Sequence, residues 1–167
     1  GIAHVFARSG HEVLLCEAEQ SFLDHGLKTL RNNLEREAAK GKITTDESSA
    51  ALARVTGVLD LERLARCDFV VEAATEKFEV KKAIFADLDQ ITRKEVILAS
   101  NTSSISITRL AGVTGRSDRV IGMHFFNPVP TMRLVEVVRS KATSQETFDQ
   151  VRDLALMLGK TPVEVND

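Results

Sequence analysis

A histidine and a glutamate twelve residues apart are the side chains best suited to acid–base chemistry in this chain. His124 ends an apolar stretch, RVIGMH (119–124), and enters FFNPVP (125–130), whose prolines prevent a helix and fix a loop. Glu136 lies within LVEVVR (134–139), where a buried carboxylate is costly unless it is paired. A turn at the prolines would bring Glu136 beside His124, where the acid would fix the imidazole tautomer and stabilise its protonated form. The alternatives are a structural histidine and an outward-facing acid on an edge strand, and the alternating pattern excludes neither.

Other polar groups follow apolar runs in the same way. Glu17 comes directly after EVLLC (12–16). In a dinucleotide-binding unit, a carboxylate there accepts hydrogen bonds from the adenosine ribose and disfavours a 2′-phosphate, whereas the alternative is a solvated acid. The run SNTSSIS (100–106) offers hydroxyls to a ligand carbonyl or amide, or caps for the next helix. Glu76 and Lys81 are charges around the start of a helix.

Short apolar runs alternate with amphipathic stretches along the whole chain. The segments expected as strands are 12–16, 55–59, 68–74, 95–100, 119–124, 134–139 and 162–165. The segments expected as helices are 1–8, 21–40, 45–52, 61–65, 78–91 and a last one that follows a capping box at 143–146 and ends at Gly159. Gly41 is placed as a helix C-cap, and Thr44 with Glu47 forms another capping box.

This alternation predicts an α/β, Rossmann-like fold, with a mostly parallel sheet, helices on both faces and a helical arm. Ligands of such folds bind outside the carboxyl ends of the strands, so the residues that close each strand are the candidates for a site. A Rossmann unit would place a strand and a G-x-G-x-x-G turn before the helix expected over residues 1–8, and neither occurs here. We therefore expect one nucleotide-binding domain over residues 1–167, truncated at its start; the resemblance described below implies truncation at the other end as well.

Bulk properties exclude several classes of protein. A formal net charge of −2 gives no basic footprint for nucleic acid, and no apolar run reaches the roughly 18 residues of a membrane span. The start of the chain lacks the pattern of a signal peptide. Cys16 and Cys67 lack the spacing of a zinc site, so we expect no metal, and two reduced thiols suit the cytoplasm. His4 and His25 are expected on helix surfaces and His11 in a turn.

Three motifs in this order resemble one enzyme family. They are VVEAATEKFEVKKAIF (70–85), ASNTSSISI (99–107) and HFFNPVPTMRLVEVV (124–138). Together they resemble the NAD-binding domain of the L-3-hydroxyacyl-CoA dehydrogenases, most of all the bacterial 3-hydroxybutyryl-CoA and 3-hydroxyadipyl-CoA enzymes. The likeness covers essentially the whole chain.

The resemblance implies a role for each matching residue. His124 would be the catalytic base, Glu136 its partner, and Ser103 a contact of both the thioester and the nicotinamide. The residues implied to bind NAD are Glu17, Glu76, Lys81, Ser103 and Asn127. Lys40 on the helical arm would contact coenzyme A with Ser103, and Asn33 would do so less clearly because many relatives have serine there.

The resemblance also implies a reaction and an assembly. The complete enzyme would oxidise L-3-hydroxyacyl-CoA reversibly to 3-ketoacyl-CoA with NAD, in fatty-acid or related acyl-CoA metabolism. In the family, a glycine-rich loop precedes the position of Gly1, and a helical domain that follows supplies a further active-site asparagine and the homodimer interface. The alternatives are a non-catalytic nucleotide-binding or structural homologue, a fragment that is inactive alone, and a dehydrogenase of free hydroxy acids.

Overall fold

A computed structural model describes residues 1–167 and divides them into two compact units. The first unit comprises Gly1–Arg63 and Asn127–Thr131, and the second comprises Leu64–Phe126 and Met132–Asp167. None of the helices is both long and apolar enough to span a membrane.

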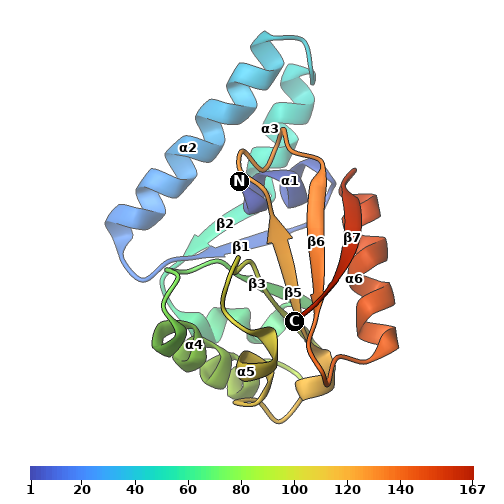
Figure 1. Cartoon of the computed structure of the whole chain (residues 1–167). Coiled ribbons are helices and arrows are strands. Elements are labelled where there is room, and N and C mark those ends of the chain that lie inside the picture. Colours follow the sequence, from blue (N-terminus) through green and yellow to red (C-terminus); the bar gives the residue numbers. More distant parts are fainter. The chain divides into compact units, whose positions relative to one another are not determined.

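The first unit combines helices with a two-stranded parallel sheet, in which Val13 pairs with Val55. Its elements are α1 (Ile2–Arg8), β1 (Val13–Cys16), α2 (Gln20–Ala39), α3 (Thr45–Ala53) and β2 (Val55–Val58). A short 3₁₀ helix, η1 (Leu61–Arg66), begins in this unit and continues into the second. Helices α2 and α3 run side by side as a helical arm (Figure 1).

Local sequence signals set the turn of the helical arm. Gly41 has a φ of +67°, a left-handed conformation in which a side chain would be strained, so α2 stops there. Thr44 then accepts a hydrogen bond from the Glu47 N–H, and the Glu47 carboxylate accepts one from the Thr44 N–H at 2.7 Å. This reciprocal capping box begins α3 and confirms the prediction for that site. The arm packs on α1 through a buried apolar cluster of Ala7, Leu30, Leu34 and Ala51.

The second unit is built on a five-stranded sheet with the order β3-β4-β5-β6-β7. Its strands are β3 (Phe69–Glu72), β4 (Ile97–Ser100), β5 (Val120–Phe125), β6 (Leu134–Arg139) and β7 (Thr161–Asn166). Its helices are α4 (Phe78–Ile91), α5 (Ile107–Ala111), the 3₁₀ turn η2 (Ser117–Arg119) and α6 (Gln145–Met157).

All strand pairings in this sheet are parallel except that of β5 with β6. Helices cover both faces, with α4 and α5 on one side and α6 on the other (Figure 1). A Cβ added at Gly122 of β5 would lie 3.2 Å from Ile107 Cδ1, so Gly122 faces α5. Ile121 and Met123 alternate with it along the strand and are fully buried.

The structure confirms the mostly parallel α/β fold and corrects or completes four details. The strands form two sheets, since no strand of this chain pairs with both. No range was given for α5, although a helix after the polar run 100–106 was one expectation, and Ser106 of that run caps it by accepting from the Arg109 N–H at 3.3 Å.

Ser144 rather than Thr143 caps α6, because the Thr143 hydroxyl accepts from the Ser140 N–H at 2.9 Å and donates to the Val120 carbonyl at 2.7 Å. His4 is buried at 1% exposure, not on a surface, because its face of α1 packs toward Glu37 of α2.

A buried arginine ties the end of α4 to the entry of β4. Arg116 is 3% exposed, and its Nε donates to Asp89 Oδ1 at 2.8 Å. Its two Nη groups donate to the backbone carbonyls of Asp89, Thr92, Arg93 and Val96. Arg116 therefore satisfies carbonyls at the end of α4 that have no partner within the helix.

Replacing Arg116 with methionine should destabilise the second unit strongly. The variant keeps most of the side-chain volume but removes the donor to Asp89 Oδ1 and leaves several buried carbonyls without a partner, so we expect a loss of about 3–5 kcal/mol. Denaturant unfolding measures this loss. Arg119→Met is the control, because Arg119 makes one backbone contact near the surface, to the Glu95 carbonyl, and a loose ion pair with the exposed Glu146 at 3.8 Å. Equal losses in the two variants would contradict the role given to Arg116.

Candidate active site

Polar side chains gather where the parallel strands of the second unit end. Glu72 closes β3 and Ser100 closes β4, and the two residues are paired in register. Strand β5 runs parallel to β4 and carries His124 near its own end, at the same edge of the sheet. The strand ends that the sequence indicated as candidates for a site therefore lie at one edge of this sheet in the second unit.

The pair of His124 and Glu136 is set by the register of two strands. His124 of β5 lies directly opposite Glu136 of β6, and the imidazole Nδ1–H donates to Glu136 Oε2 at 2.8 Å. The exposed fractions of the side chains are 18% and 35%, so the pair is partly shielded and still open on one side. Because Nδ1 is committed to the carboxylate, Nε2 is the ring nitrogen that can take up a proton. The turn at the prolines thus pairs the two residues, and β6 is an inner strand rather than an edge.

A glycine allows these two strands to approach closely just before the pair. A Cβ at Gly122 would lie 2.7 Å from the Cβ of Val138, the residue opposite it in β6. Real Cβ atoms do not approach so closely, so any larger residue at position 122 would push β6 away. The contact between His124 and Glu136, two residues further along, depends on this close pairing.

A buried ion pair supports the ends of β3 and α4. Lys81 is 1% exposed, and its ammonium donates to Glu72 Oε1 at 2.8 Å and Oε2 at 3.1 Å. The same ammonium donates to the Ala74 carbonyl, and Ser100 Oγ donates to Glu72 Oε2 at 2.7 Å. Both charges are thereby satisfied by several hydrogen bonds, the condition under which burial of a charge is tolerated.

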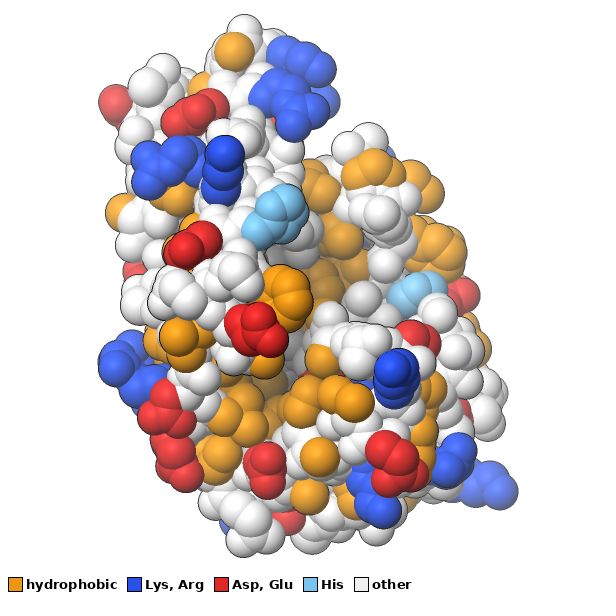
Figure 2. Space-filling view, turned by 90° about the vertical axis from the view of Figure 1, so that its left-hand side faces the viewer, with side chains coloured by type: hydrophobic (Ala, Val, Ile, Leu, Met, Phe, Trp, Pro, Cys, Tyr) orange, Lys and Arg blue, Asp and Glu red, His pale blue; other side chains and the backbone are white.

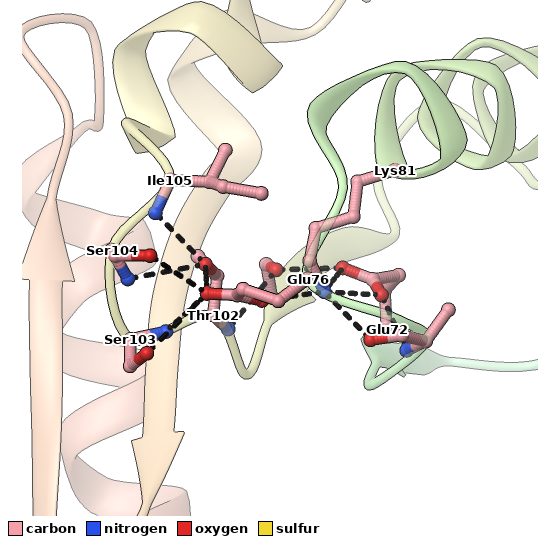
Figure 3. Close-up of polar contacts among 9 residues, drawn as sticks. Glu72, Glu76, Lys81, Thr102, Ser103, Ser104 and Ile105 are labelled. Carbon is pink, nitrogen blue, oxygen red and sulfur yellow. Dashed lines mark hydrogen bonds and ion pairs between the residues drawn. The ribbon is translucent and has the colours of Figure 1, made fainter.

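The Glu76 carboxylate accepts hydrogen bonds from several groups of the loop after β4 (Figure 3). Its Oε1 accepts hydrogen bonds from Thr102 Oγ1, from the Ser103 N–H at 3.0 Å and from Ser104 Oγ at 3.2 Å. Its other oxygen lies 3.4 Å from the Lys81 ammonium. Glu76 therefore links the buried ion pair to the exposed Ser103, whose hydroxyl is 3.4 Å from Oε1.

These contacts keep Glu76 ionised. Partial burial raises the pKa of its carboxyl, but the hydrogen bonds from Thr102 and Ser103 and the charge of Lys81 outweigh burial and lower the pKa to about 2. The carboxylate is consequently an acceptor only at neutral pH.

Two further residues brace this region, and Asp167 is the one that was not among the candidates from the sequence. Asn101 Oδ1 accepts from the Phe125 N–H at 2.8 Å, which joins the loop after β4 to the residue after His124. The Asp167 carboxylate accepts from Ser106 Oγ and from the N–H groups of Ile107 and Thr108, and so caps α5. Asn101 lies in the predicted polar run, whereas nothing in the sequence links Asp167 to α5.

The remaining predicted residues lie in the first unit. Glu17 follows β1, is half-buried, and its N–H donates to the Val58 carbonyl at 3.1 Å. Asn33 lies on α2 and Lys40 directly follows this helix, seven residues further along, and Asn33 Oδ1 accepts from Arg36 at 2.9 Å. Lys40 is exposed at the end of the arm, where Lys and Arg side chains are visible in Figure 2. Asn127 is exposed and lies two residues after the end of β5.

The structure brings together five of the predicted residues, in two groups within the second unit. The groups are His124 with Glu136, and Ser103 with Glu76 and Lys81. Lys81 is enclosed, so its ammonium acts on Glu76 and Glu72 and is hidden from solvent. No group of His, Cys, Asp and Glu side chains in the chain has the arrangement of a metal site.

Comparisons with known proteins agree on one family. The family model described as 3-hydroxyacyl-CoA dehydrogenase, NAD binding domain, matches residues 1–167. A 3-hydroxybutyryl-CoA dehydrogenase of Bradyrhizobium diazoefficiens is 46% identical over 160 residues, which are 96% of this chain and 55% of that protein. A 3-hydroxyadipyl-CoA dehydrogenase of Escherichia coli is 43% identical over 163 residues, 98% of this chain and 34% of that protein.

Solved structures give the same result. The crystal structure of a 3-hydroxybutyryl-CoA dehydrogenase from Escherichia coli has a TM-score of 0.97 at 42% identity, covering 99% of this chain and 35% of its own. That of an (S)-3-hydroxybutyryl-CoA dehydrogenase from Ralstonia eutropha has a TM-score of 0.97 at 44% identity, covering 99% and 59%. In all these comparisons the chain matches only part of the relative; it spans about 55% of the length of the Bradyrhizobium protein.

Replacing Glu76 with glutamine should remove a pH-dependent part of the stability. A carboxyl with a lowered pKa in the folded state stabilises the fold above its unfolded pKa of about 4.3, and the contribution is lost as pH falls toward 2. We expect wild type to exceed Glu76→Gln in melting temperature at pH 7, and the difference to shrink between about pH 4.3 and 2.

Thermal unfolding across this pH range measures the effect. Glu79→Gln is the control, because the Glu79 side chain is 80% exposed and should show little such difference. A gap between wild type and Glu76→Gln that stays constant with pH would contradict the role of the ionised carboxylate.

Proposed function

The chain belongs to the 3-hydroxyacyl-CoA dehydrogenase family, as its NAD-binding domain, and we propose that the full-length protein carrying it oxidises L-3-hydroxyacyl-CoA to 3-ketoacyl-CoA reversibly. The observation that supports the proposal most strongly is the contact of 2.8 Å between His124 and Glu136, near the end of β5 where the parallel strands also end. A base that is held by an acid and open on its other nitrogen suits removal of a hydroxyl proton.

In the proposed reaction, His124 Nε2 accepts the proton of the 3-hydroxyl as the C–O bond becomes a carbonyl. The chemistry that bound NAD would supply is acceptance of the hydride from C3, by which the carbon would be oxidised and the cofactor reduced. Glu136 stabilises the imidazolium that forms and keeps Nε2 directed away from the carboxylate. In the reverse direction, the imidazolium returns the proton to the ketone oxygen.

The residues present fit the cofactor and the thioester. Glu17 supplies a carboxylate after β1, the position from which ribose hydroxyls are bound and a 2′-phosphate is repelled. Ser103 has an exposed hydroxyl that we assign to the thioester carbonyl and the nicotinamide, and we assign Asn127 to the nicotinamide side. Glu76 and Lys81 are assigned to the NAD pocket, with Lys81 acting through Glu76 because it is buried.

Coenzyme A is assigned to the helical arm. Lys40 carries an exposed ammonium that can pair with a phosphate, and Asn33 lies on α2 seven residues before it. This pair supports a coenzyme A ester as substrate rather than a free hydroxy acid.

Two further proposals concern the assembly and the compartment. We propose that the full-length protein forms a homodimer through a segment that lies outside this chain. Light scattering, which measures the molecular mass in solution, tests this proposal. We also propose a cytoplasmic protein, which is supported by two cysteines that are not in a disulfide.

Replacing His124 with alanine in the full-length protein should lower turnover by about 10²–10⁴-fold, because the base is removed. Acetoacetyl-CoA-dependent oxidation of NADH measures turnover, and NADH fluorescence measures cofactor binding, which should change little. His25→Ala is the control, since His25 is exposed on α2. Full turnover in His124→Ala would contradict the assignment of His124 as the base. A wild-type protein without activity at any acyl-chain length would favour a non-catalytic homologue.

Glu136→Gln should give a smaller loss than His124→Ala. The amide keeps an acceptor beside Nδ1 but removes the negative charge that stabilises the imidazolium. The rise of the oxidation rate with pH should therefore move to lower pH. An unchanged pH–rate profile would show that the pair does not act as a unit.

A further inference from the structure

The hydroxyl of Ser103 is the most weakly held group in its loop. Its single contact is to Glu76 Oε1 at 3.4 Å, whereas the Ser103 N–H donates to the same oxygen at 3.0 Å. That oxygen already accepts from Thr102 Oγ1 and from Ser104 Oγ. A carboxylate oxygen with three better donors holds a fourth only weakly, so the Ser103 hydroxyl can turn to a ligand while its backbone stays fixed.

Thr102 is the residue that organises this arrangement (Figure 3). It is 5% exposed, and its hydroxyl donates to Glu76 while accepting from the N–H groups of Ser104 at 3.3 Å and Ile105 at 3.0 Å. The hydroxyl thus closes the loop around Ser103 on one side and fixes the Glu76 carboxylate on the other. This use of a threonine hydroxyl is the side-chain capping of a turn.

The loop is also anchored to the buried ion pair. The Thr102 N–H donates to Ser100 Oγ at 3.3 Å, and Ser100 Oγ donates to Glu72 at 2.7 Å. Lys81 binds both Glu72 and Glu76, so the two ends of Thr102 lead to the same enclosed ammonium. A fully buried and paired charge moves little, which makes it a rigid reference for the exposed loop.

We propose that Thr102 is a positioning residue for Ser103, which rests on the proposed function of Ser103 as a contact of the thioester and the nicotinamide. Its hydroxyl holds the loop backbone and Glu76 in the geometry that leaves the Ser103 hydroxyl available to the ligand. Thr102 itself is buried and touches neither substrate nor cofactor.

The test is a double-mutant cycle with Ser103 in the full-length protein. Thr102→Val keeps the shape but removes the hydroxyl, and we expect kcat/KM to fall by about 10–100-fold, as for a catalytic contact displaced by about 1 Å. Thr102→Ser keeps the hydroxyl and should stay within about threefold of wild type. In a Ser103→Ala background, Thr102→Val should cost less than about twofold more, because the two residues act as one.

A matched control separates positioning from stability. Thr92 is similarly buried and its hydroxyl donates to the Leu88 carbonyl at the end of α4, so Thr92→Val should lower the melting temperature but leave kcat/KM unchanged. If Thr102→Val does not fold, Thr102→Cys carries the same expectation, because a thiol is a weak donor and acceptor of similar size. Equal losses in both Ser103 backgrounds, or none in either, would overturn the proposal.

A second measurement does not depend on activity. Amide hydrogen exchange should show the Ser103 N–H protected in wild type and in Thr102→Ser, but not in Thr102→Val. Loss of this difference overturns the positioning role even in an active enzyme. A wild type without turnover, or full activity in Ser103→Ala, overturns the proposed function instead, and the exchange measurement then still decides whether Thr102 holds Ser103.

Discussion

The antiparallel pairing of β5 with β6 is the constraint on which the candidate chemistry depends. Every other pairing in the two sheets is parallel. A parallel neighbour of β5 would need a long crossover connection, whereas an antiparallel one returns through the short proline loop. The return places Glu136 directly opposite His124, and side chains opposite each other in such a pair lie on the same face. The dyad is therefore a consequence of strand register, with Gly122 allowing the strands to meet closely.

The second support of the site is a buried ion pair in the second unit. Glu72 and Lys81 are both buried, which is costly for either alone and tolerated only because each satisfies the other. Glu76 connects this ion pair to the surface, since one of its oxygens contacts Lys81 and the other accepts hydrogen bonds from the loop after β4. The loop thus combines an exposed serine with a backbone that is tied to the core of the unit. Pre-organisation of this kind reduces the ordering that a ligand must impose.

Much of this architecture could be predicted from the sequence. The periodicity of apolar residues gave the order of helices and strands, and the ends of α2 and α3 follow from Gly41 and the Thr44 capping box. The errors have physical causes. The capping box expected at Thr143 failed because tertiary contact with the Val120 carbonyl occupied that hydroxyl. His4 was misplaced because the face of a short helix that is buried depends on its neighbours.

The sequence by itself determined which residues could do chemistry at the strand ends, because residue types, apolar runs and turn signals are local properties. Residue types and spacing pointed to His124 and Glu136 and left the orientation of Glu136 open, whereas the roles of Ser103 and Glu76 were implied only by the resemblance to a family. Only the tertiary structure decided that Glu136 faces His124, that Lys81 is enclosed and that the Thr102 hydroxyl meets Glu76. These facts depend on strand register and on contacts between residues up to 26 positions apart, which a local pattern does not specify.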